Sequence, residues 1–336
     1  MGSNIQVLMK QHPTGWVQET DFEIVERPIP TPGPGELLVR NIWLSLDPYM
    51  RGAMDPVRSY RASLKPGDLM IGGSVGQVMQ SNNPKFPVGA HVVGYLGWQA
   101  YGVSDGIGLN IVDPKIAPLS AWLGVVGMPG VTAHYGLMQI GQPKAGDTVV
   151  VSAASGAVGG TVGQIARLKG CRVVGIAGGA EKCNYVVKEL GFDACIDYKA
   201  ADMHEQFKAA TPDRVDVYFE NVGGQILEMV AARLDTFARV ALCGIISQYN
   251  LTKQEGFTGM RHLLVNRASI TGFIISDHLP YWPGAIGELA GWLQQGKLKF
   301  RESVAEGLHS APAAFIGMLG GKNFGKQLVR VGPDTL

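Results

Sequence analysis

The feature that most restricts the fold of this chain is a glycine-rich turn between an apolar run and a helical segment. The run TVVVSAA begins at Thr148 and suits a strand buried on both faces, whereas TVGQIARLKG has the apolar spacing of a helix that ends at Gly170. SGAVGG lies between them. The small residues Ala153, Gly156 and Gly159 let a pyrophosphate approach the backbone amides at a helix N-terminus, because no side chain fills that space.

This turn predicts a dinucleotide-binding site. The predicted contacts are Ala153, Ser155, Gly156, Ala157, Val158 and Gly159. A glycine fingerprint alone is a weak signal, but this one follows a strand, opens a helix and precedes further strand–helix pairs. The alternative is a structural turn that packs the helix on the sheet.

Strand and helix patterns alternate beyond this turn. CRVVGIAG, ACIDY, VDVYFENVG, ARVALCGI and ASITGFII are predicted strands, and AEKCNYVVKELG, DMHEQFKAAT and ILEMVAARL are predicted helices between the first four. With TVVVSAA they make six strands, as in a complete dinucleotide fold. We therefore predict an α/β fold with a Rossmann doubly wound parallel sheet.

The chain before this region has a different pattern, in which turn signals separate short β-like runs from Asn4 to about Pro118. A length of 336 residues also favours two domains. We predict a β-rich domain over 1–120, a Rossmann dinucleotide-binding domain over 121–295, and a segment over 296–336 that returns to the β-rich domain.

Charge and cysteine patterns exclude several function classes. Lys and Arg total 29 against 28 Asp and Glu, without a basic block, so we expect no nucleic-acid and no anionic-membrane partner. Cys171, Cys183, Cys195 and Cys243 lack the close pairing of a zinc site, so we predict reduced thiols and no metal. We find no signal-peptide pattern, and prolines or glycines interrupt the two long uncharged stretches. These features predict a cytoplasmic protein without membrane spans.

The end of the second predicted strand indicates which dinucleotide binds. Ala177, Gly178 and Gly179 stand where NAD-preferring sites place an acidic residue. No carboxylate repels the extra 2′-phosphate of NADP here, and Lys182 lies one helical turn further on. We predict NADP(H) as the cofactor, held in part by Gly178 and Lys182. An ordinary exposed helix lysine is the alternative for Lys182.

Seven motifs occur in order along the chain: LSLDPYMRG, GMPGVTAH, AASGAVGGTVGQIARLKGCRVVG, FENVGG, CGIISQYN, GFIIS and GKNFGK. Together they resemble the zinc-independent medium-chain dehydrogenase/reductases of the prostaglandin reductase and alkenal double-bond reductase group, and most of all the bacterial NADPH-dependent curcumin reductases. The resemblance implies a GroES-like catalytic domain, an inserted Rossmann domain and a homodimer joined near residues 270–275. It also implies a reaction: hydride transfer from NADPH to the β-carbon of an unsaturated ketone or aldehyde, followed by protonation of the enolate.

The resemblance further implies cofactor contacts. Lys182 and Tyr198 match positions that hold the adenosine phosphate, Asn221 matches a residue that borders the ribose and nicotinamide, and Asn323 matches another cofactor contact. A plain strand-end tyrosine, an Asx turn before Gly223 and a turn asparagine are the alternatives for Tyr198, Asn221 and Asn323. The remaining predicted contacts, in CGIISQYN and GFIIS, are Cys243, Ser247, Tyr249 and Phe273.

The implied chemistry develops charge on an enolate oxygen, which requires a hydrogen-bond donor. Tyr249 is the first candidate and Tyr49 in DPYMRG the second, with a pocket-lining or core-packing tyrosine as the alternative for each. For Arg51 we favour a bracing salt bridge over a cofactor contact. Plant members carry a pocket tyrosine in a GYGV segment, where this chain has GGSVG with Ser74, so we expect a roomier or differently shaped site. His134 is predicted to be structural.

Three functions remain in competition. The leading hypothesis is NADPH-dependent reduction of enones or alkenals, either reactive alkenals or bulky dienones of the curcumin type. Quinone reduction by the same hydride site is a second hypothesis. A non-catalytic NADPH-binding protein is the third, although the joint presence of Tyr49, Asn221 and Tyr249 argues against it.

Overall fold

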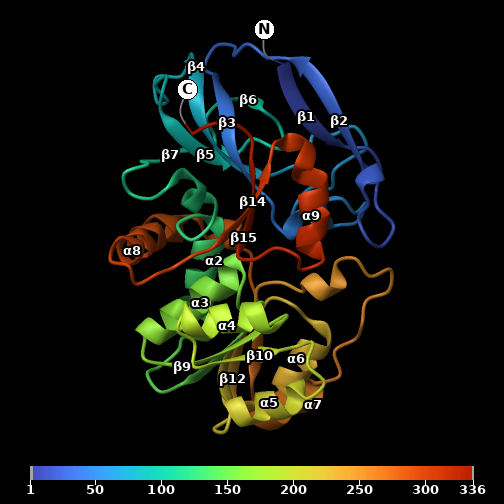
Figure 1. The fold of residues 1–336 in the computed structure, drawn as a ribbon, viewed down its shortest axis with the longest axis vertical. Coiled ribbons are helices and arrows are strands. Elements are labelled where there is room, and N and C mark those ends of the chain that lie inside the picture. Colours follow the sequence, from blue (N-terminus) through green and yellow to red (C-terminus); the bar gives the residue numbers. More distant parts are fainter. Residues whose placement is uncertain (1–2, 335–336) are drawn as a thin grey trace. The chain divides into compact units, whose positions relative to one another are not determined.

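The structure is a computed structural model that describes residues 3–334. The chain divides into two compact units (Figure 1). Unit 1 contains the chain up to Leu123 and the segment from Glu302 onward, and unit 2 is Gly124–Arg301.

Unit 2 is built on a six-stranded parallel sheet in the order β10-β9-β8-β11-β12-β13. Its strands are β8 (Thr148–Ser152), β9 (Arg172–Ala177), β10 (Ala194–Asp197), β11 (Val215–Glu220), β12 (Leu234–Leu242) and β13 (Ser269–Gly272). The central strand β8 is buried along its whole length, as its uninterrupted apolar run requires. This arrangement confirms the predicted α/β fold with a doubly wound parallel sheet.

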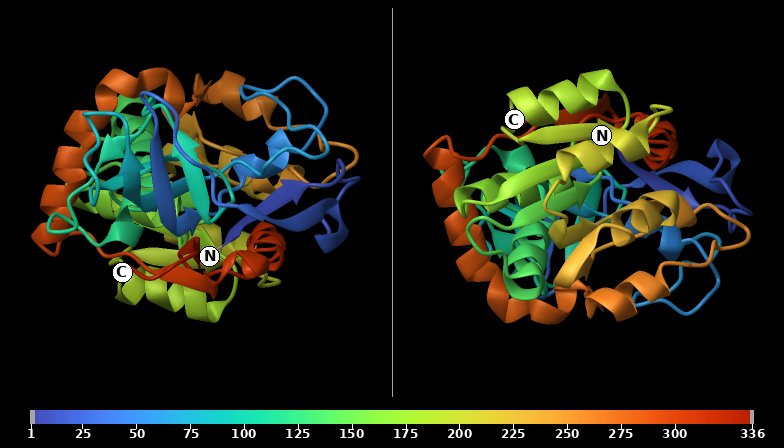
Figure 2. Two further views of the ribbon diagram at one scale, coloured as in Figure 1. Left: turned by 90° about the horizontal axis from the view of Figure 1, so that it is seen from above. Right: turned by 90° about the horizontal axis from the view of Figure 1, so that it is seen from below.

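Helices of unit 2 pack against this sheet (Figure 2). They are α3 (Ala157–Leu168), α4 (Ala180–Lys188), α5 (Met203–Ala210), α6 (Gly224–Ala231) and α7 (Met260–Asn266). The first four occupy the segments that the sequence predicts to be helical. The apolar faces of α5, α6 and α7 form one core with the sheet, with Val150, Phe207 and Tyr218 among its fully buried members.

Unit 2 begins with α2 (Met128–Tyr135), which continues into a π-helical turn, η3 (Gly136–Gly141). After β13 come the 3-10 segment η5 (Ile275–Tyr281) and α8 (Trp282–Gln294). His134 on α2 is buried, and its ring nitrogens lie 2.7 Å from the Tyr281 hydroxyl and 3.0 Å from a Glu288 carboxylate oxygen. These contacts link α2 to η5 and α8 and give His134 the structural role predicted for it.

Unit 1 contains a β-rich core and short helices. A seven-stranded sheet has the order β14-β15-β3-β4-β5-β7 with β6 paired to β3, and β1 pairs with β2 in a separate ribbon. Its strands are β1 (Ser3–Met9), β2 (Phe22–Pro28), β3 (Leu37–Ser45), β4 (Gly73–Ser81), β5 (His91–Tyr95), β6 (Tyr101–Ser104), β7 (Asn110–Ile111), β14 (Glu302–Glu306) and β15 (Lys326–Arg330). Its helical segments are η1 (Glu19–Asp21), α1 (Tyr49–Ala53), η2 (Leu119–Leu123), η6 (Leu308–Ser310) and α9 (Ala311–Leu319).

The C-terminal segment completes the sheet of unit 1, because β15 pairs antiparallel with β3. In the core of unit 1, the Trp98 ring stacks on Phe22 at a centroid distance of 5.7 Å and meets Phe315 of α9 edge-on at 5.6 Å. Segments far apart in sequence thus share one aromatic cluster. Within residues 3–334 we find no helix that combines the length and the apolar character needed to span a membrane.

Candidate functional site

The glycine-rich turn lies between β8 and α3. Ala153 adopts a left-handed backbone conformation with φ of 50°, and Gly156 is the N-cap of α3 without a side-chain capping bond. A Cβ atom at Gly159 would lie 2.4 Å from the Ala153 carbonyl oxygen, so no other residue fits there. The turn therefore presents backbone at the start of a helix of twelve residues, a cradle that fits a pyrophosphate.

The same helix also supports the structural interpretation of its glycines. A Cβ atom at Gly163 would lie 1.8 Å from the Phe192 ring, so helix α3 depends on a glycine there to pack closely. Gly159 faces the turn and Gly163 faces the neighbouring aromatic ring. Both glycines therefore have a packing role, and the pyrophosphate contact of the turn stays a prediction.

A second group of predicted residues lies at the end of β9. A Cβ atom at Gly178 would lie 2.8 to 2.9 Å from the Tyr198 ring and hydroxyl, so Tyr198 lies directly against the Gly178 backbone. The nearby Asp197 carboxylate accepts hydrogen bonds from the Gly179 and Lys199 amides at 2.8 and 3.0 Å. Backbone amides of unit 2 thus hold the Asp197 carboxylate at the end of β10.

Two lysines accompany Tyr198. Burial, and next the charge of Lys199, lower the pKa of Lys182, so the two ammonium groups are near enough to repel each other. A phosphate dianion between them would relieve this repulsion, so the pair fits the 2′-phosphate of NADP. Sequence reasoning missed Lys199, although it directly follows the predicted strand end IDY.

The FENVGG motif is organised by a buried carboxylate at the end of β11. Glu220 accepts hydrogen bonds from the Tyr218 hydroxyl at 2.5 Å, the Ser152 hydroxyl at 3.0 Å, and the amides of Val222 and Gly223. It is fully buried, and this burial raises its pKa despite the four donors. Glu220 therefore joins the ends of β8 and β11 in one network.

Asn221 is fixed by the same network. Its side-chain amide donates to the Ser152 carbonyl at 2.8 Å, and its backbone amide donates to the Ser152 hydroxyl at 2.8 Å. The Asx turn considered for this residue would need the Gly223 amide, which donates to Glu220 instead. The Asx-turn alternative is therefore wrong, because a buried carboxylate outcompetes the Asn221 side chain for that donor.

Tyr249 ends the 3-10 turn η4 (Ile246–Gln248) that follows β12. Its hydroxyl accepts a hydrogen bond from the Ile245 amide at 3.3 Å and lies 3.1 Å from the Cβ position of Gly244. Burial raises the pKa of Tyr249, so its phenol stays protonated near neutral pH and is available as a donor. The hydroxyl is held against the backbone that follows β12.

Other predicted residues of CGIISQYN lie on the same segment. The Ser247 hydroxyl donates to the Val222 carbonyl at 2.6 Å, which ties this loop to the one after β11. Burial raises the pKa of Cys243 to about 12, so its thiol is neutral. The ends of β8, β11 and β12 thus bring Ser152, Asn221 and Tyr249 to one edge of the parallel sheet.

Phe273 and Asn323, both predicted cofactor contacts, have partners within the protein. The Phe273 ring packs against Tyr135 and Phe219 at centroid distances of 5.7 and 6.3 Å. The Asn323 amide donates to the Gly325 carbonyl at 2.8 Å and so holds its own turn, the alternative that the sequence left open. Both side chains have structural partners.

In unit 1, the predicted site residue Tyr49 lies at the start of α1. Its hydroxyl is buried without a hydrogen-bond partner among the described residues, and burial followed by the Asp47 charge raises its pKa well above the ordinary value. The Asp47 carboxylate is itself held by the Lys326 ammonium at 2.9 Å and by the Ser45 hydroxyl. Tyr49 is therefore a protonated phenol on an anchored segment.

Two residues beside Tyr49 escaped the sequence analysis. The Arg61 guanidinium lies 4.7 Å from the Tyr49 ring centroid and 4.6 Å from that of Tyr95, and it donates to the Tyr95 hydroxyl at 2.9 Å. We call Tyr49, Arg61 and Tyr95 the tyrosine–arginine cluster. The aromatic run GYLGW around Tyr95 was the one available signal, and nothing in the pattern around Arg61 marks it.

Two other expectations concern unit 1. Arg51 is buried, pairs with Asp55 at 2.5 Å and donates to the Gly15 carbonyl at 3.0 Å, which supports the bracing role. Ser74 is fully buried with its hydroxyl 3.5 Å from the Gly97 carbonyl, and the roomier or differently shaped site stays a prediction. Tyr95 lies on the adjacent strand β5, opposite Gly73.

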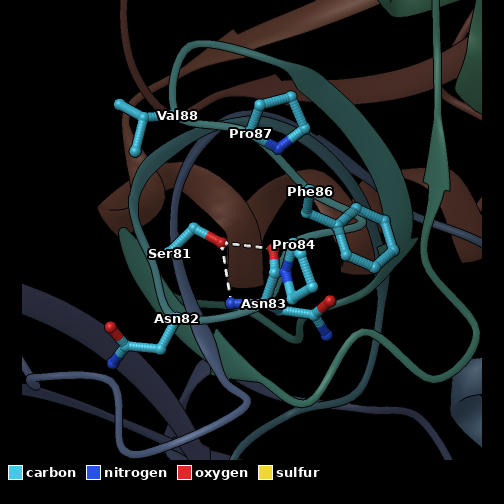
Figure 3. Close-up of a pocket in the computed structure, with 7 residues that line it drawn as sticks. All are labelled: Ser81, Asn82, Asn83, Pro84, Phe86, Pro87 and Val88. Atoms are coloured by element: carbon cyan, nitrogen blue, oxygen red, sulfur yellow. Dashed lines mark hydrogen bonds between the residues drawn. The ribbon is translucent and has the colours of Figure 1, made fainter.

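No group of three or more His, Cys, Asp or Glu in the described part of the chain is placed to hold a metal ion. A pocket of about 460 Å³ lies at the loop between β4 and β5, where the Ser81 hydroxyl bonds the backbone of Asn83 (Figure 3). Its lining residues are Ser81, Asn82, Asn83, Pro84, Phe86, Pro87 and Val88. None of these residues carries an acid, a base or a thiol, so the pocket offers no group for acid–base or nucleophilic catalysis.

Comparisons with known proteins agree with this fold. Residues 6–112 match the family model for the N-terminal domain of oxidoreductase, and residues 157–291 match the model for zinc-binding dehydrogenase. The NADPH-dependent curcumin reductase of Escherichia coli is 44% identical over 98% of both chains, and the NADP-dependent 2-alkenal reductase of Nicotiana tabacum is 41% identical over 98% of both.

A solved structure extends the comparison. The crystal structure of CurA from Vibrio vulnificus in complex with NADPH is 47% identical, with a TM-score of 0.93 over 98% of this chain and 99% of that one. The matched part of the chain includes both units and both regions that the family models match. The chain therefore belongs to the medium-chain dehydrogenase/reductases, in the group that includes the alkenal and curcumin reductases.

Proposed function

We propose that this protein uses NADPH to reduce the C=C bond of α,β-unsaturated ketones and aldehydes, including curcumin-like dienones. One structural observation carries the proposal: a backbone cradle, an anchored Asn221 and the protonated Tyr249 phenol share the edge of one parallel sheet. The similar curcumin and 2-alkenal reductases are NADPH- or NADP-dependent, and the similar CurA structure contains NADPH.

The cofactor is held by unit 2 in this proposal. The turn over 153–159 binds the pyrophosphate through backbone amides, and Lys182, Lys199 and Tyr198 hold the 2′-phosphate. Asn221 borders the ribose and nicotinamide. Bound NADPH supplies the hydride that is added to the β-carbon of the substrate. Residues 121–295 act as the cofactor domain, and residues 1–120 with 296–336 act as the catalytic domain.

Tyr249 stabilises the oxygen on which charge develops. Its phenol is buried and protonated, so it donates a hydrogen bond to the carbonyl oxygen as that oxygen becomes an enolate. The α-carbon then takes a proton to complete the reduction. No nucleophile is needed, which fits the neutral Cys243 thiol on the same segment. Tyr49 of unit 1 stays the second candidate for this donor.

We also propose a cytoplasmic homodimer formed through the edge of the unit 2 sheet. Strand β13 is the last strand of that sheet, and α7 beside it exposes Met260, Leu264 and Val265. Light scattering after size exclusion should give twice the 35.9 kDa chain mass. Leu264→Lys should shift the protein toward monomer, whereas Ile107→Lys, at an exposed site of unit 1, should not. A monomeric wild type contradicts this proposal.

The activity is tested by following NADPH oxidation with an enone, a 2-alkenal, a curcuminoid and a quinone, and by repeating the series with NADH. Fast enone turnover with NADPH and slow turnover with NADH is the expected result. Quinone turnover equal to or faster than that of the enone would indicate a quinone reductase. Absence of turnover with NADPH binding intact would indicate a non-catalytic protein.

A further inference from the structure

Two cysteines of unit 2 lie against each other at one side of its sheet. The thiol of Cys195, on β10, donates a hydrogen bond to the sulfur of Cys183, on α4. Both side chains are free thiols and partly exposed. The two cysteines are twelve residues apart in the sequence, so no short cysteine motif marks them. The contact between the thiols is therefore a product of the fold.

The packing of α4 on the sheet explains this contact. Gly175 on β9 is the register partner of Cys195, and a Cβ atom at Gly175 would lie 2.9 Å from a Val186 methyl carbon. The missing side chain lets α4 approach the sheet closely at this point. Val186 is fully buried, and Cys183, three residues earlier, lies on the same face of the helix. The face of α4 that covers Gly175 thus brings Cys183 to Cys195.

The two thiols differ in their chemistry. The hydrogen bond from Cys195 is the main cause that lowers the pKa of Cys183, whereas the same bond, followed by burial, raises the pKa of Cys195. Cys183 is therefore the thiol that ionises first and attacks as a nucleophile. Cys195 stays protonated beside it until the Cys183 sulfur has reacted.

The surrounding elements permit a bond between the two sulfur atoms. A disulfide holds its sulfur atoms about 2.05 Å apart, which requires the hydrogen-bonded thiols to approach further. Strand β10 is an outer strand of the sheet, and α4 has nine residues. Both elements have neighbours on one side only along the sheet edge, so they absorb a small approach more easily than the central strands would.

We propose that Cys183 and Cys195 are a modification site, which small-molecule disulfides such as oxidised glutathione convert to an intramolecular disulfide. The Cys183 thiolate attacks one sulfur of oxidised glutathione and expels one glutathione thiolate. Cys195 then attacks the Cys183 sulfur of the mixed disulfide and expels the second one. The two thiol protons of the protein go to the two expelled thiolates. One small disulfide is thus reduced to two thiols while the cysteine pair is oxidised.

No step of this exchange uses NADPH or an unsaturated substrate, so the site is independent of the proposed reductase activity. The test treats the native full-length protein with oxidised glutathione, blocks the remaining thiols with iodoacetamide, and maps its tryptic peptides without reduction. Cleavage after Lys182, Lys188 and Lys199 places the two cysteines in separate peptides, 183–188 and 189–199.

The expected result is one linked pair of these two peptides, which dithiothreitol separates. Alkylation of both Cys183 and Cys195 after treatment of the folded wild-type protein would overturn the proposal. Peptides linked instead through Cys171 or Cys243 would also overturn it, because these are the other cysteines of the chain.

Variants test the order of the two steps. Cys195→Ser should stop at the mixed disulfide and carry one glutathione on Cys183, because the second attacking thiol is gone. Cys183→Ser should carry little or none. Cys171→Ser is the matched control and should give the same linked peptides as the wild type. Equal glutathione levels on the first two variants would overturn the assignment of Cys183 as the attacking thiol.

Alkylation rates of the reduced native protein test the same assignment without any variant. Burial raises the pKa of Cys171 to about 11, whereas the pKa of Cys183 is lowered from its ordinary value. Cys183 should react with iodoacetamide about tenfold or more faster than Cys171, because its larger thiolate fraction outweighs its lower intrinsic nucleophilicity. Equal rates at the two cysteines would overturn the assignment.

Discussion

The turn at the start of α3 and the tyrosine–arginine cluster are built by opposite means. The turn uses backbone and excludes side chains, since a Cβ at Gly159 would lie 2.4 Å from the Ala153 carbonyl. The cluster uses large side chains from three separate segments, held by cation–π contacts and one hydrogen bond. A backbone site tolerates almost no substitution, whereas a side-chain site changes its preference one residue at a time. The turn is therefore the rigid region of the two, and the cluster is the adjustable one.

The largest effect should come from adding a side chain to the turn. Gly159→Ala places a Cβ against a backbone carbonyl that has no room to move, so NADPH affinity should fall roughly a hundredfold or more, about 3 kcal/mol. Fluorescence titration of NADPH checks the affinity, and thermal unfolding reports the accompanying loss of stability.

Gly160→Ala is the matched control for this prediction. Its Cβ would lie 3.1 Å from a Leu190 methyl group, which is side chain and is able to shift. Equal losses at Gly159 and Gly160 would contradict the distinction between a backbone site and a side-chain site.

The next largest effect concerns Tyr249, the proposed hydrogen-bond donor to the substrate oxygen. Tyr249→Phe removes the hydroxyl while keeping the ring, so kcat should fall about tenfold or more, as when one oxyanion donor is removed. NADPH affinity should change little, because the ring still packs beside Gly244. Steady-state kinetics with an enone and a cofactor titration test the two parts. An unchanged kcat would assign Tyr249 to lining the pocket.

A smaller effect tests the phosphate site. Lys182→Ala removes one of two neighbouring ammonium groups, so NADPH affinity should fall about tenfold while NADH affinity stays within twofold. Lys188→Ala, at an exposed position of the same helix, is the control. Equal losses for NADPH and NADH would place Lys182 away from the 2′-phosphate.

The smallest effect is a change in the pH dependence of stability. Burial raises the pKa of Glu220 in the folded chain, so the folded protein binds this proton more tightly than the unfolded chain does. The free energy of unfolding should therefore decrease as pH rises from the ordinary glutamate range, about 4.3, to the raised value. Glu220→Gln does not titrate and should remove this decrease.

Urea unfolding at a series of pH values measures that difference. Glu205→Gln, exposed on α5, should keep the wild-type slope. If the slope is the same in Glu220→Gln and the wild type, Glu220 is not its source. In that case the network at the end of β11 would stabilise a carboxylate that is already ionised.

The contrast between the two regions also explains what the sequence could predict. Local patterns determine the six parallel strands and the turn at Gly159, because strand, turn and helix follow one another along the chain. Arg61 meets Tyr95 only after β5 folds beside β4, so no local pattern marks the pair. The Asx turn at Asn221 was wrong for a related reason: Glu220, one residue earlier, takes the Gly223 amide only because β11 buries its carboxylate.

The pairing of β15 with β3 has a consequence for synthesis on the ribosome. Unit 2 is one continuous stretch and can fold while the chain is still being made, since domains generally fold as units from the N-terminal side. Unit 1 has to wait, because its sheet needs β15 and Asp47 needs the Lys326 ammonium. A nascent chain can thus complete unit 2 first, and the segment that carries Tyr49 gains its last partner only once β15 has been made.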